Sequence, residues 1–271
     1  MKYIISWIIK NIPRTVLQRF SHFFLRIIQV FYLGKDVECP VCGRKYRKML
    51  PYGRNPARGN ALCPNCLSLE RHRLIWLFLK EKTGLFNDKI KFLHIAPELC
   101  FIHRFESLPD LNYISADIES PLAKVKMDIH KIPFKENTFD AAMCNHVLEH
   151  VDDDIQAMGE ILRVLKPGGW AILQVPFMGK NLQKTFEDPS VTTPLEREKV
   201  FGQRDHVRTY GLDYADRLRS AGFEVHEDKY VMELAEDKVK RYALPSDEVI
   251  YFCIKPAGYY SSIEPTNEAG N

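Results

Sequence analysis

The sequence predicts an α/β fold in which a mostly parallel sheet of seven strands carries helices on both faces. Short apolar runs alternate with amphipathic segments from residue 88 onward, two C-x2-C pairs precede them, and an apolar segment with interspersed cations begins the chain. Strand–helix alternation is typical of parallel sheets, because a parallel connection needs a crossover segment. The 271 residues suffice for one large domain and a smaller appendage.

The first segment, residues 1–34, is apolar but is not one uninterrupted membrane span. Lys10 and Arg14 interrupt it, and Pro13 breaks any single helix. Its apolar positions repeat at helical spacing, so we expect amphipathic helices that either lie on an anionic membrane surface or pack on the protein body. No signal-peptide cleavage site follows, and we therefore expect a cytoplasmic protein, with peripheral attachment at the inner face of the membrane as the further expectation.

Charge is distributed unevenly along the chain. Residues 1–82 hold 16 Lys and Arg against 4 Asp and Glu, whereas the remainder holds 22 against 31. A basic N-terminal third on an acidic body indicates an anionic partner, either phospholipid headgroups or nucleic acid. A solvated positive face is the alternative.

Four cysteines come next, in the segment CPVCGRKYRKMLPYGRNPARGNALCPNC. Two C-x2-C pairs separated by twenty residues have the spacing of a tetrahedral four-thiolate zinc site. Four protein ligands leave no open position, so we expect a structural zinc in a small zinc ribbon over residues 35–70. A redox dithiol or two disulfides are the alternatives. The predicted ligands are Cys39, Cys42, Cys63 and Cys66.

Residues between the two cysteine pairs are basic, with Tyr46 and Tyr52 interleaved. Such a ribbon could hold an RNA backbone, and it could equally be a solvated loop. RNA is therefore a partner that the sequence permits but does not favour.

Seven strands and two longer helices are expected in the body of the chain. A connecting helix over 71–89 leads into a domain over 90–256, and a flexible tail over 257–271 follows. Pro167-Gly168-Gly169 and Gly222 are expected to end the two helices. The expected strands are 90–95, 111–116, 125–127, 141–145, 170–175, 223–225 and 249–254, and the expected helices are 152–165 and 212–221.

Acidic residues follow the second and third strands of this domain. Asp117 closes the strand YISAD, and Asp128 closes VKMD. Ligands of open parallel sheets bind beyond the carboxyl ends of the strands. The first carboxylate suits a ribose diol, because it can accept hydrogen bonds from both hydroxyls, and the second suits the amino group of an adenine.

The segment DIHKIPFKENTFDAAMCNHVLEHVDDDIQAMGEILRVLKPGGWAILQVP, Asp128–Pro176, resembles the central part of class I S-adenosylmethionine-dependent methyltransferases of the type 11-like group. The resemblance covers about residues 90–255 and implies a Rossmann-like fold with S-adenosyl-L-methionine as cofactor. The zinc ribbon joined to such a domain is also similar in architecture to large-subunit ribosomal RNA guanine methyltransferases with an N-terminal zinc module.

The chain departs from this family at the turn after the first strand, where the family has D-x-G-x-G-x-G. His94 stands at the acidic position, Ala96 at the first glycine and Glu98 at the second. Side chains crowd such a turn, and the backbone loses easy access to positive φ. Glu98 could still accept hydrogen bonds from the cofactor's ammonium group. The cofactor-binding residues that we expect are His94, Ala96, Glu98, Asp117, Ile118, Asp128, Ile129 and Asn145.

Two polar clusters are candidates for the chemistry of methyl transfer. The resemblance places Asn145 and His146 nearest the cofactor, whereas Glu149 and His150 are expected to organise the start of the next helix. The segment FGQRDHVRTYG lies where the family builds its acceptor site, and His206 could act as a base. The expected catalytic residues are Asn145, His146 and His206, and the expected substrate-binding residues are Arg204, His206, Arg208 and Tyr210.

These observations predict a methyltransferase whose acceptor is a small molecule, a saccharide or a lipid-linked intermediate. The first alternative is an RNA base methyltransferase, which is less favoured because Asn145-His146-Val147-Leu148 replaces the N-P-P-Y-type motif. The second is a non-catalytic scaffold with a degenerate cofactor turn.

Overall fold

The protein is described by a computed structural model over residues 28–53, 57–176 and 182–258. These residues form two compact units. The first contains residues up to Thr83 together with Leu99–Arg104 and Tyr230–Glu248, and the second contains the rest. The amphipathic helices predicted over 1–34 lie outside the described residues except at their C-terminal end, and the predicted tail lies outside them from residue 259.

Among its described residues the first unit contains two small antiparallel ladders, β1–β2 and β3–β4, three α-helices and one short 3-10 helix. The cysteine pairs follow β1 and β4. The connecting helix expected over 71–89 is present but ends at Lys82. The elements are η1 (Gln29–Tyr32), β1 (Leu33–Glu38), β2 (Lys45–Tyr46), β3 (Leu50–Tyr52), β4 (Arg58–Leu62), α3 (Glu70–Lys82), α8 (Tyr230–Glu233) and α9 (Glu236–Arg241).

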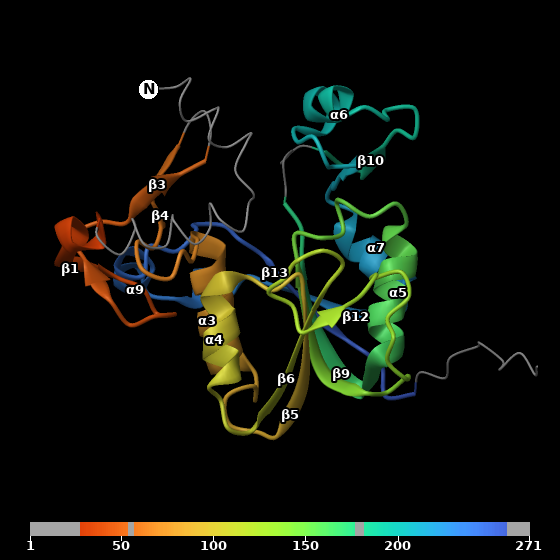
Figure 1. The fold of residues 1–271 in the computed structure, drawn as a ribbon, viewed down its shortest axis with the longest axis horizontal. Helices are drawn as coiled ribbons and strands as arrows, with labels where there is room; N and C mark the ends of the chain where they lie inside the picture. The colour runs from red at the N-terminus through yellow and green to blue at the C-terminus, as the bar shows by residue number, and fades with distance from the viewer. Residues whose placement is uncertain (1–27, 54–56, 177–181, 259–271) are drawn as a thin grey trace, which may run out of the picture. The chain divides into compact units, whose positions relative to one another are not determined.

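The second unit contains a seven-stranded sheet in the order β12-β13-β9-β8-β5-β6-β7 (Figure 1). The strands from β7 to β9 are parallel, and β13 is antiparallel to both of its neighbours. This confirms the mostly parallel seven-stranded sheet. The strands are β5 (Ile90–Ile95), β6 (Leu111–Asp117), β7 (Val125–Lys126), β8 (Phe139–Asn145), β9 (Leu165–Gln174), β12 (Glu224–Asp228) and β13 (Ile250–Ile254).

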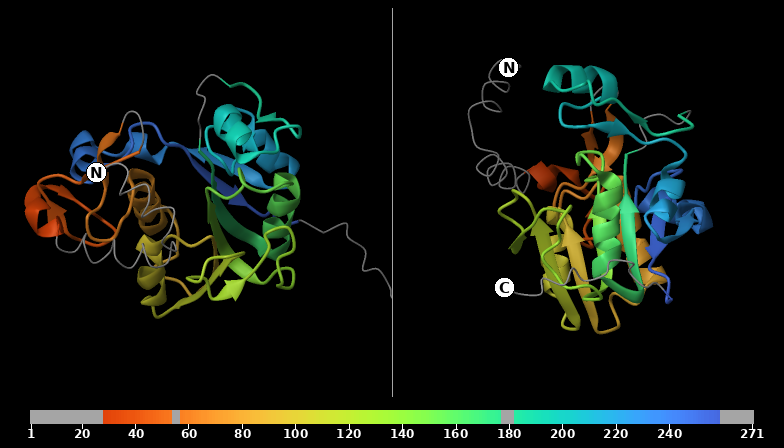
Figure 2. Two further views of the ribbon diagram at one scale, coloured as in Figure 1. Left: turned by 45° about the horizontal axis from the view of Figure 1, so that its top comes forward. Right: turned by 90° about the vertical axis from the view of Figure 1, so that its right-hand side faces the viewer.

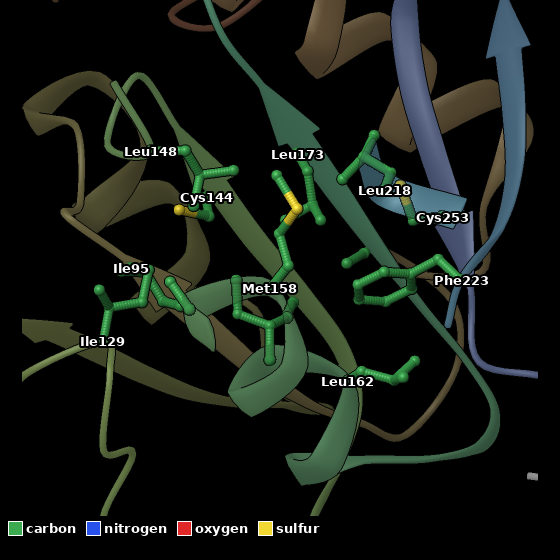
Figure 3. Close-up of a cluster of buried hydrophobic side chains, with 14 of the residues drawn as sticks. Ile95, Ile129, Cys144, Leu148, Met158, Leu162, Leu173, Leu218, Phe223 and Cys253 are labelled. Atoms are coloured by element: carbon green, nitrogen blue, oxygen red, sulfur yellow. The ribbon is translucent and has the colours of Figure 1, made fainter. Parts of the chain in front are cut away.

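One face of this sheet packs against α5 (Asp154–Val164) and α7 (Tyr214–Ser220). Figure 3 shows Met158 of α5 among apolar side chains that come from the strands and from α7. Met158 and Leu162 are completely buried there, as are Cys144 and Leu173 of the sheet. Because side chains alternate along a strand, Leu93 and Ile95 of β5 also belong to this core.

The same alternation directs Phe92 and His94 of β5 to the opposite face. Their rings lie 5.3 Å and 5.8 Å, between centroids, from the ring of Phe105. Tyr113 of β6 and Trp170 of β9 join this aromatic layer. His94 is therefore a buried residue of a core face. Phe105 belongs to α4 (Leu99–Glu106), whose residues 99–104 are part of the first unit.

Strand β9 begins earlier than the sequence predicts. Helix α5 ends at Val164, one residue before the expected position, and β9 starts at Leu165, so Pro167-Gly168-Gly169 lies within the strand. Gly168 has φ +76 and donates a backbone hydrogen bond to Lys255. A Cβ on Gly169 would lie 2.8 Å from the Lys166 carbonyl oxygen, so no larger residue fits. These glycines shape an irregular strand start.

The chain between β9 and α7 forms an insertion that follows the carboxyl end of β9 (Figure 2). It contains β10 (Phe186–Glu187), α6 (Pro194–Phe201) and β11 (Arg208–Thr209). Thr193 and Glu196 form a capping box at the start of α6, and Gly202 ends the helix with φ +84. No helix among the described residues is both long and apolar enough to cross a membrane.

Candidate functional site

Strand register brings the predicted cofactor residues to one edge of the sheet. Ile95 pairs with Ala116 on one side and with Cys144 on the other, so Ala96, Asp117 and Asn145 follow at neighbouring strand ends. The Ala96 N–H extends the ladder by donating to the Ala116 carbonyl oxygen at 2.8 Å. Parallel strands thus assemble the edge that the sequence predicts.

Ala96 adopts the left-handed conformation in spite of its Cβ. Its φ is +50, in the left-handed region that favours glycine. An L-residue other than glycine or asparagine destabilises the fold by about 1–2 kcal/mol in this region. The turn therefore reaches positive φ without a glycine. The residue that does so is an alanine, and its backbone is strained.

Glu98 is held at this edge by two side chains. Its Oε2 lies 2.6 Å from His94 Nε2, and its Oε1 accepts a hydrogen bond of 2.9 Å from Asn145 Nδ2. His94 Nδ1 lies 2.9 Å from the Tyr113 hydroxyl. A neutral imidazole satisfies both contacts if Tyr113 donates to Nδ1 and Nε2–H donates to Glu98. The network fixes a carboxylate that is 17% exposed.

Asp117 is oriented by the turn that follows it. Its Oδ1 accepts hydrogen bonds from the backbone N–H groups of Glu119 and Ser120 at 2.8 Å and 2.6 Å. Within the described part of the chain, Oδ2 has no hydrogen bond, so the carboxylate is fixed at one oxygen. Ile118, the next residue, is 56% exposed. This geometry suits a ligand that lies over Ile118 and donates to Asp117.

Asp128 is also fixed by local hydrogen bonds and remains exposed. The backbone N–H and Nδ1 of His130 both lie 2.9 Å from its Oδ1. The backbone hydrogen bond lowers the pKa of the Asp128 carboxyl, and the side-chain contact adds to this effect. Ile129 is 6% exposed and packs in the core, so its backbone N–H is the group that it offers to a ligand.

The turn after β8 places His146 beside Glu149. His146 has φ +55 and donates its backbone N–H to the Gln174 carbonyl oxygen at 2.8 Å. Its Nδ1 lies 3.5 Å from Glu149 Oε1. His146 Nε2 is buried without a hydrogen bond among the described residues.

The predicted acceptor-site residues lie in very different environments. His206 is 2% exposed. Its burial lowers the pKa of its imidazole, although the negative charge of Glu149 acts in the opposite direction. Arg204 is exposed and pairs with Glu198 at 2.7 Å. Neither observation tests whether His206 or Arg204 binds the acceptor, so this role stays a prediction for both residues.

Arg208 and Tyr210 are buried and bonded to the protein. The Arg208 guanidinium donates to the carbonyl oxygens of Leu148, Val151 and Asp152. These bonds fix the loop between β8 and α5 to the insertion. Their predicted role in acceptor binding stays untested, and the structure gives them a supporting role.

Asp154 joins Tyr210 to this network. Its Oδ2 accepts a hydrogen bond of 2.8 Å from the Tyr210 hydroxyl, and its Oδ1 accepts one of 2.6 Å from Arg217. Burial alone would raise the pKa of Asp154, but the Arg217 hydrogen bond and the charge of Arg208 hold it below its ordinary value. The carboxylate therefore stays charged at the buried start of α5.

The four cysteines of the first unit converge on one point. Sulfur–sulfur distances are 3.6 Å for Cys39–Cys66 and 3.7 Å for Cys42–Cys63, and the four sulfurs lie within 4.8 Å of one another. These distances exclude disulfides, whose sulfurs are about 2.05 Å apart. A tetrahedral ion with bonds of about 2.3 Å separates its sulfurs by about 3.8 Å. The cluster therefore fits a zinc ion.

Both cysteine pairs have the same backbone turn. The Gly43 N–H donates to the Cys39 carbonyl oxygen, and the Leu67 N–H donates to that of Cys63. Gly43 has φ +72 and Leu67 has φ +62. Because a leucine in this conformation is strained, the second turn requires a compensating interaction.

Arg73 of α3 is completely buried beside this cluster. Its guanidinium donates to the carbonyl oxygens of Asn60, Ala61 and Ser68 and to those of residues 242 and 243. Each of these acceptors is a backbone oxygen, so none of them neutralises the charge of Arg73. Four thiolates around a divalent cation would carry two negative charges in excess, and a buried guanidinium offsets part of that charge.

Sequence reasoning missed Arg73, Tyr113 and the position of Glu149. Arg73 directly precedes the apolar run Leu74–Leu79 of α3, and this position next to the core is a weak signal for a buried cation. Tyr113 pairs with Phe92, and strand alternation could have placed it beside His94. Glu149 is 1% exposed, and its burial is not indicated by the polar residues around it in the sequence.

The second unit also has a hollow of about 540 Å³ at the amino ends of β5 and β6. Lys91, Asp110 and Asp140 are among its lining residues. It lies at the opposite ends of the strands from Ala96 and Asp117, and none of the predicted site residues lines it.

Comparisons with known proteins match the central part of the second unit. Residues 107–173 match the methyltransferase domain family. The ubiquinone/menaquinone biosynthesis C-methyltransferase UbiE of Desulfotalea psychrophila is 48% identical over 42 residues, which are 16% of this chain and 17% of that protein. Cycloartenol-C-24-methyltransferase 1 of rice is 35% identical over 129 residues, which are 45% of this chain and 34% of that protein.

The chain thus spans about a third or less of the length of these two relatives. The crystal structure of an S-adenosylmethionine-dependent methyltransferase from Mesorhizobium loti aligns with 66% of this chain and 97% of its own, with a TM-score of 0.44 and 15% identity. The matched segment contains Asp117, Asp128 and Asn145 at the carboxyl edge of the sheet. The family match and this edge together support a class I methyltransferase domain in this chain.

Proposed function

We propose that this chain transfers a methyl group from S-adenosylmethionine to an acceptor that is a small molecule, a saccharide or a lipid-linked intermediate. The observation that carries the proposal is the row of fixed polar groups at the carboxyl edge. Glu98, Asp117 and Asp128 are each oriented by hydrogen bonds from the protein. They lie at or just after the carboxyl ends of β5, β6 and β7. Asp117 and Asp128 are within residues 107–173, which match the family, and Glu98 precedes that segment.

Each of these groups has a counterpart on the cofactor. Glu98 offers a partly exposed carboxylate to the ammonium group, and Asp117 accepts from the ribose hydroxyls. Asp128 accepts from the adenine amino group, while the Ile129 N–H donates to a ring nitrogen. The exposed Ile118 side chain packs against the base. Methyl transfer is an in-line displacement at the methyl carbon, so the protein contributes mainly by positioning the two reactants.

Calorimetric titration with S-adenosylmethionine and S-adenosylhomocysteine tests this proposal. Micromolar affinity corresponds to about 8 kcal/mol of binding free energy and is the expected result. Asp117→Ala removes a charged acceptor, and a hydrogen bond to a charged group contributes about 1.5–3 kcal/mol, so affinity should fall at least about tenfold.

Asp110→Ala is the matched control, because Asp110 is an exposed aspartate at the opposite ends of the strands. Its affinity should equal that of the wild type. If Asp117→Ala binds normally, Asp117 has no role at the ribose. If the wild type binds neither ligand, the non-catalytic scaffold becomes the better interpretation.

We also propose a structural zinc ion in the four-cysteine cluster. The sulfur separations match a tetrahedral ion, and Arg73 supplies a buried positive charge beside it. The ion would link the turn at Gly43 to the turn at Leu67 and offset the strain of the latter. Since all four ligands are cysteines, such an ion would stabilise the fold of the first unit and take no part in methyl transfer.

An anionic membrane surface is the proposed partner of residues 1–34, at the inner face of the membrane in the cytoplasm. Residues 1–27 lie outside the described structure, so this proposal rests on their apolar and cationic pattern. Flotation with anionic liposomes should recover the full chain but not a chain that begins at residue 35. Equal recovery would contradict it. RNA is less favoured, because Tyr46 is completely buried and only Tyr52, which is 47% exposed, offers a stacking surface.

A further inference from the structure

The second unit contains a cluster of metal-binding side chains beside the predicted methyl-transfer site. One ligand atom each of Glu149, His150 and His206 lies within 4.8 Å of the others. Glu149 and His150 belong to the loop after β8, and His206 belongs to the insertion before β11. We propose that these three residues form a binding site for a divalent transition-metal ion.

The two segments are fixed to one another by backbone interactions. The Val207 N–H donates to the Glu149 carbonyl oxygen at 2.9 Å. The guanidinium of Arg208 adds bonds to the carbonyl oxygens of Leu148 and Val151, on either side of Glu149 and His150. Fixed backbone on both sides preorganises the three side chains for a ligand.

His150 presents a lone pair to the cluster. Its Nδ1 lies 3.1 Å from the Asp205 carbonyl oxygen, which only accepts hydrogen bonds, so Nδ1 carries the proton. In the neutral imidazole, Nε2 is then an acceptor, and it lies 3.9 Å from Glu149 Oε1. A hydrogen bond from Nδ1–H to a carbonyl is also the usual support of a metal-bound histidine. Two acceptors therefore face each other across a space that a cation would fill.

Glu149 supplies a second, independent observation. It is 1% exposed, and its Oε2 has no hydrogen bond partner within the described residues. Buried carboxylates are normally paired or bound to metals, because leaving one unpaired is costly. His146 Nδ1 lies 3.5 Å from the other oxygen, Oε1, and leaves Oε2 unbonded.

His206 completes the set. It is 2% exposed, and its ligand nitrogen lies within 4.8 Å of the ligand atoms of Glu149 and His150. Its ring meets that of His150 edge-on, with the centroids 4.7 Å apart and an angle of 85° between the planes. Metal–ligand bonds of about 2.0–2.2 Å require the donors to move together by about 1 Å, which side-chain rotation can supply.

Two imidazoles and one carboxylate select a particular class of ion. Imidazole nitrogens favour zinc, copper, iron or nickel over magnesium, calcium or manganese. Three protein ligands leave at least one open position, in contrast to the four-cysteine cluster. That position would take an oxygen of the acceptor, as a hydroxyl or carboxylate; this assignment of the acceptor, unlike the metal site, rests on the proposed methyl transfer.

The test measures how many zinc ions each full-length protein binds. After equilibrium dialysis against micromolar Zn²⁺, the bound zinc per chain is compared among variants. Glu149→Gln and His206→Gln should each bind one ion fewer than the wild type. His226→Ala should bind as many as the wild type, because His226 is an exposed histidine beside Glu224, 3.2 Å away, in another part of the unit. Equal zinc in all four proteins would overturn the proposal.

A second arm removes the other metal cluster and does not depend on the folding of those variants. The double variant Cys39→Ser/Cys63→Ser should still bind one zinc ion, and retention of none would overturn the proposal. Cofactor titration separates the two proposals. Loss of zinc with normal S-adenosylmethionine binding in Glu149→Gln supports a separate metal site. If the chain binds zinc at this site but never binds the cofactor, the metal site stands and only the proposed methyltransferase function is contradicted.

Discussion

The four-cysteine cluster of the first unit and the Glu149–His150–His206 cluster of the second differ in how the chain assembles them. Each cysteine pair spans four residues and brings its own turn, so its geometry is local. Glu149 and His206 are far apart in the sequence and meet only because the insertion folds back onto the loop after β8. Local geometry is readable from spacing, whereas the second kind of cluster depends on the whole sheet.

The clusters also differ in the charge that surrounds them. Four cysteines fill every position of a tetrahedral ion, and Arg73 lies buried beside them. Glu149, His150 and His206 provide three donors and an unbonded carboxylate oxygen. The first arrangement suits a structural role and the second leaves room for an exchangeable ligand.

The largest effect that separates the two regions is expected from removing cysteine ligands. Cys39→Ser/Cys63→Ser should release the proposed zinc, and structural zinc sites stabilise small modules by about 10–16 kcal/mol, so β1–β4 should unfold. Hydrogen exchange should then become fast over residues 33–62 and remain slow in β5, β8 and β9.

Cys100→Ser is the control for this change. Cys100 is a buried cysteine of the same unit and lies outside the cluster. Its substitution should leave the bound zinc unchanged. Slow exchange over residues 33–62 in the double variant would show that the unit folds without its ion, and the comparison between the clusters would lose its basis.

A smaller loss of stability is expected when the buried charge of the first unit is removed. Arg73→Met keeps the apolar stem but removes the guanidinium donors from five backbone oxygens, of which only that of Ser68 is also bonded to a backbone N–H in the described turns, that of Cys63. Because each buried unpaired acceptor costs about 1–3 kcal/mol and water re-enters at some of them, we expect a loss of about 3–5 kcal/mol for this unit.

Urea unfolding followed by hydrogen exchange over α3 would measure this loss. Arg71→Met is the matched control, since Arg71 is the neighbouring arginine of the same helix and is only half-buried. Equal stability of the two variants would mean that Arg73 does not support the cluster.

Several parts of the molecule could be predicted from the sequence because their signals are local. β5 has the expected bounds, Ile90–Ile95, since its apolar run is flanked by polar residues and a proline turn. The cysteines outside the two pairs, Cys100, Cys144 and Cys253, are buried, which is usual for a small apolar side chain. Asp117 and Asp128 stand at strand ends because the ends of apolar runs are readable.

Other parts depend on partners that are distant in the sequence. β9 starts five residues earlier than expected, because Gly168 and Gly169 form backbone hydrogen bonds with Lys255, which directly follows β13. No local sequence pattern predicts this pairing. Residues 230–248 belong to the first unit, although the strand–helix alternation assigned them to the domain over 90–256. The meeting of His150 and His206 likewise required the folded insertion.

The smallest effect concerns the backbone strain at one alanine in each unit. Ala96 in the cofactor turn has φ +50, and Ala243 in the first unit has φ +46. Glycine adopts this conformation without the penalty of about 1–2 kcal/mol but loses more chain entropy on folding, by about 0.5–1 kcal/mol. Ala96→Gly should therefore stabilise the second unit by about 0.5 kcal/mol, and Ala243→Gly should do the same for the first.

Urea midpoints of the two units measure both changes, and cofactor titration separates them. If Ala96 is strained only to form the turn, Ala96→Gly gains stability without loss of S-adenosylmethionine affinity. If the alanine methyl group also fixes the turn around Glu98, affinity falls although the fold gains stability. A loss of stability at Ala96 with a gain at Ala243 would show that the cofactor turn relies on its side chain, and that the glycine-free sequence is an adaptation of this site.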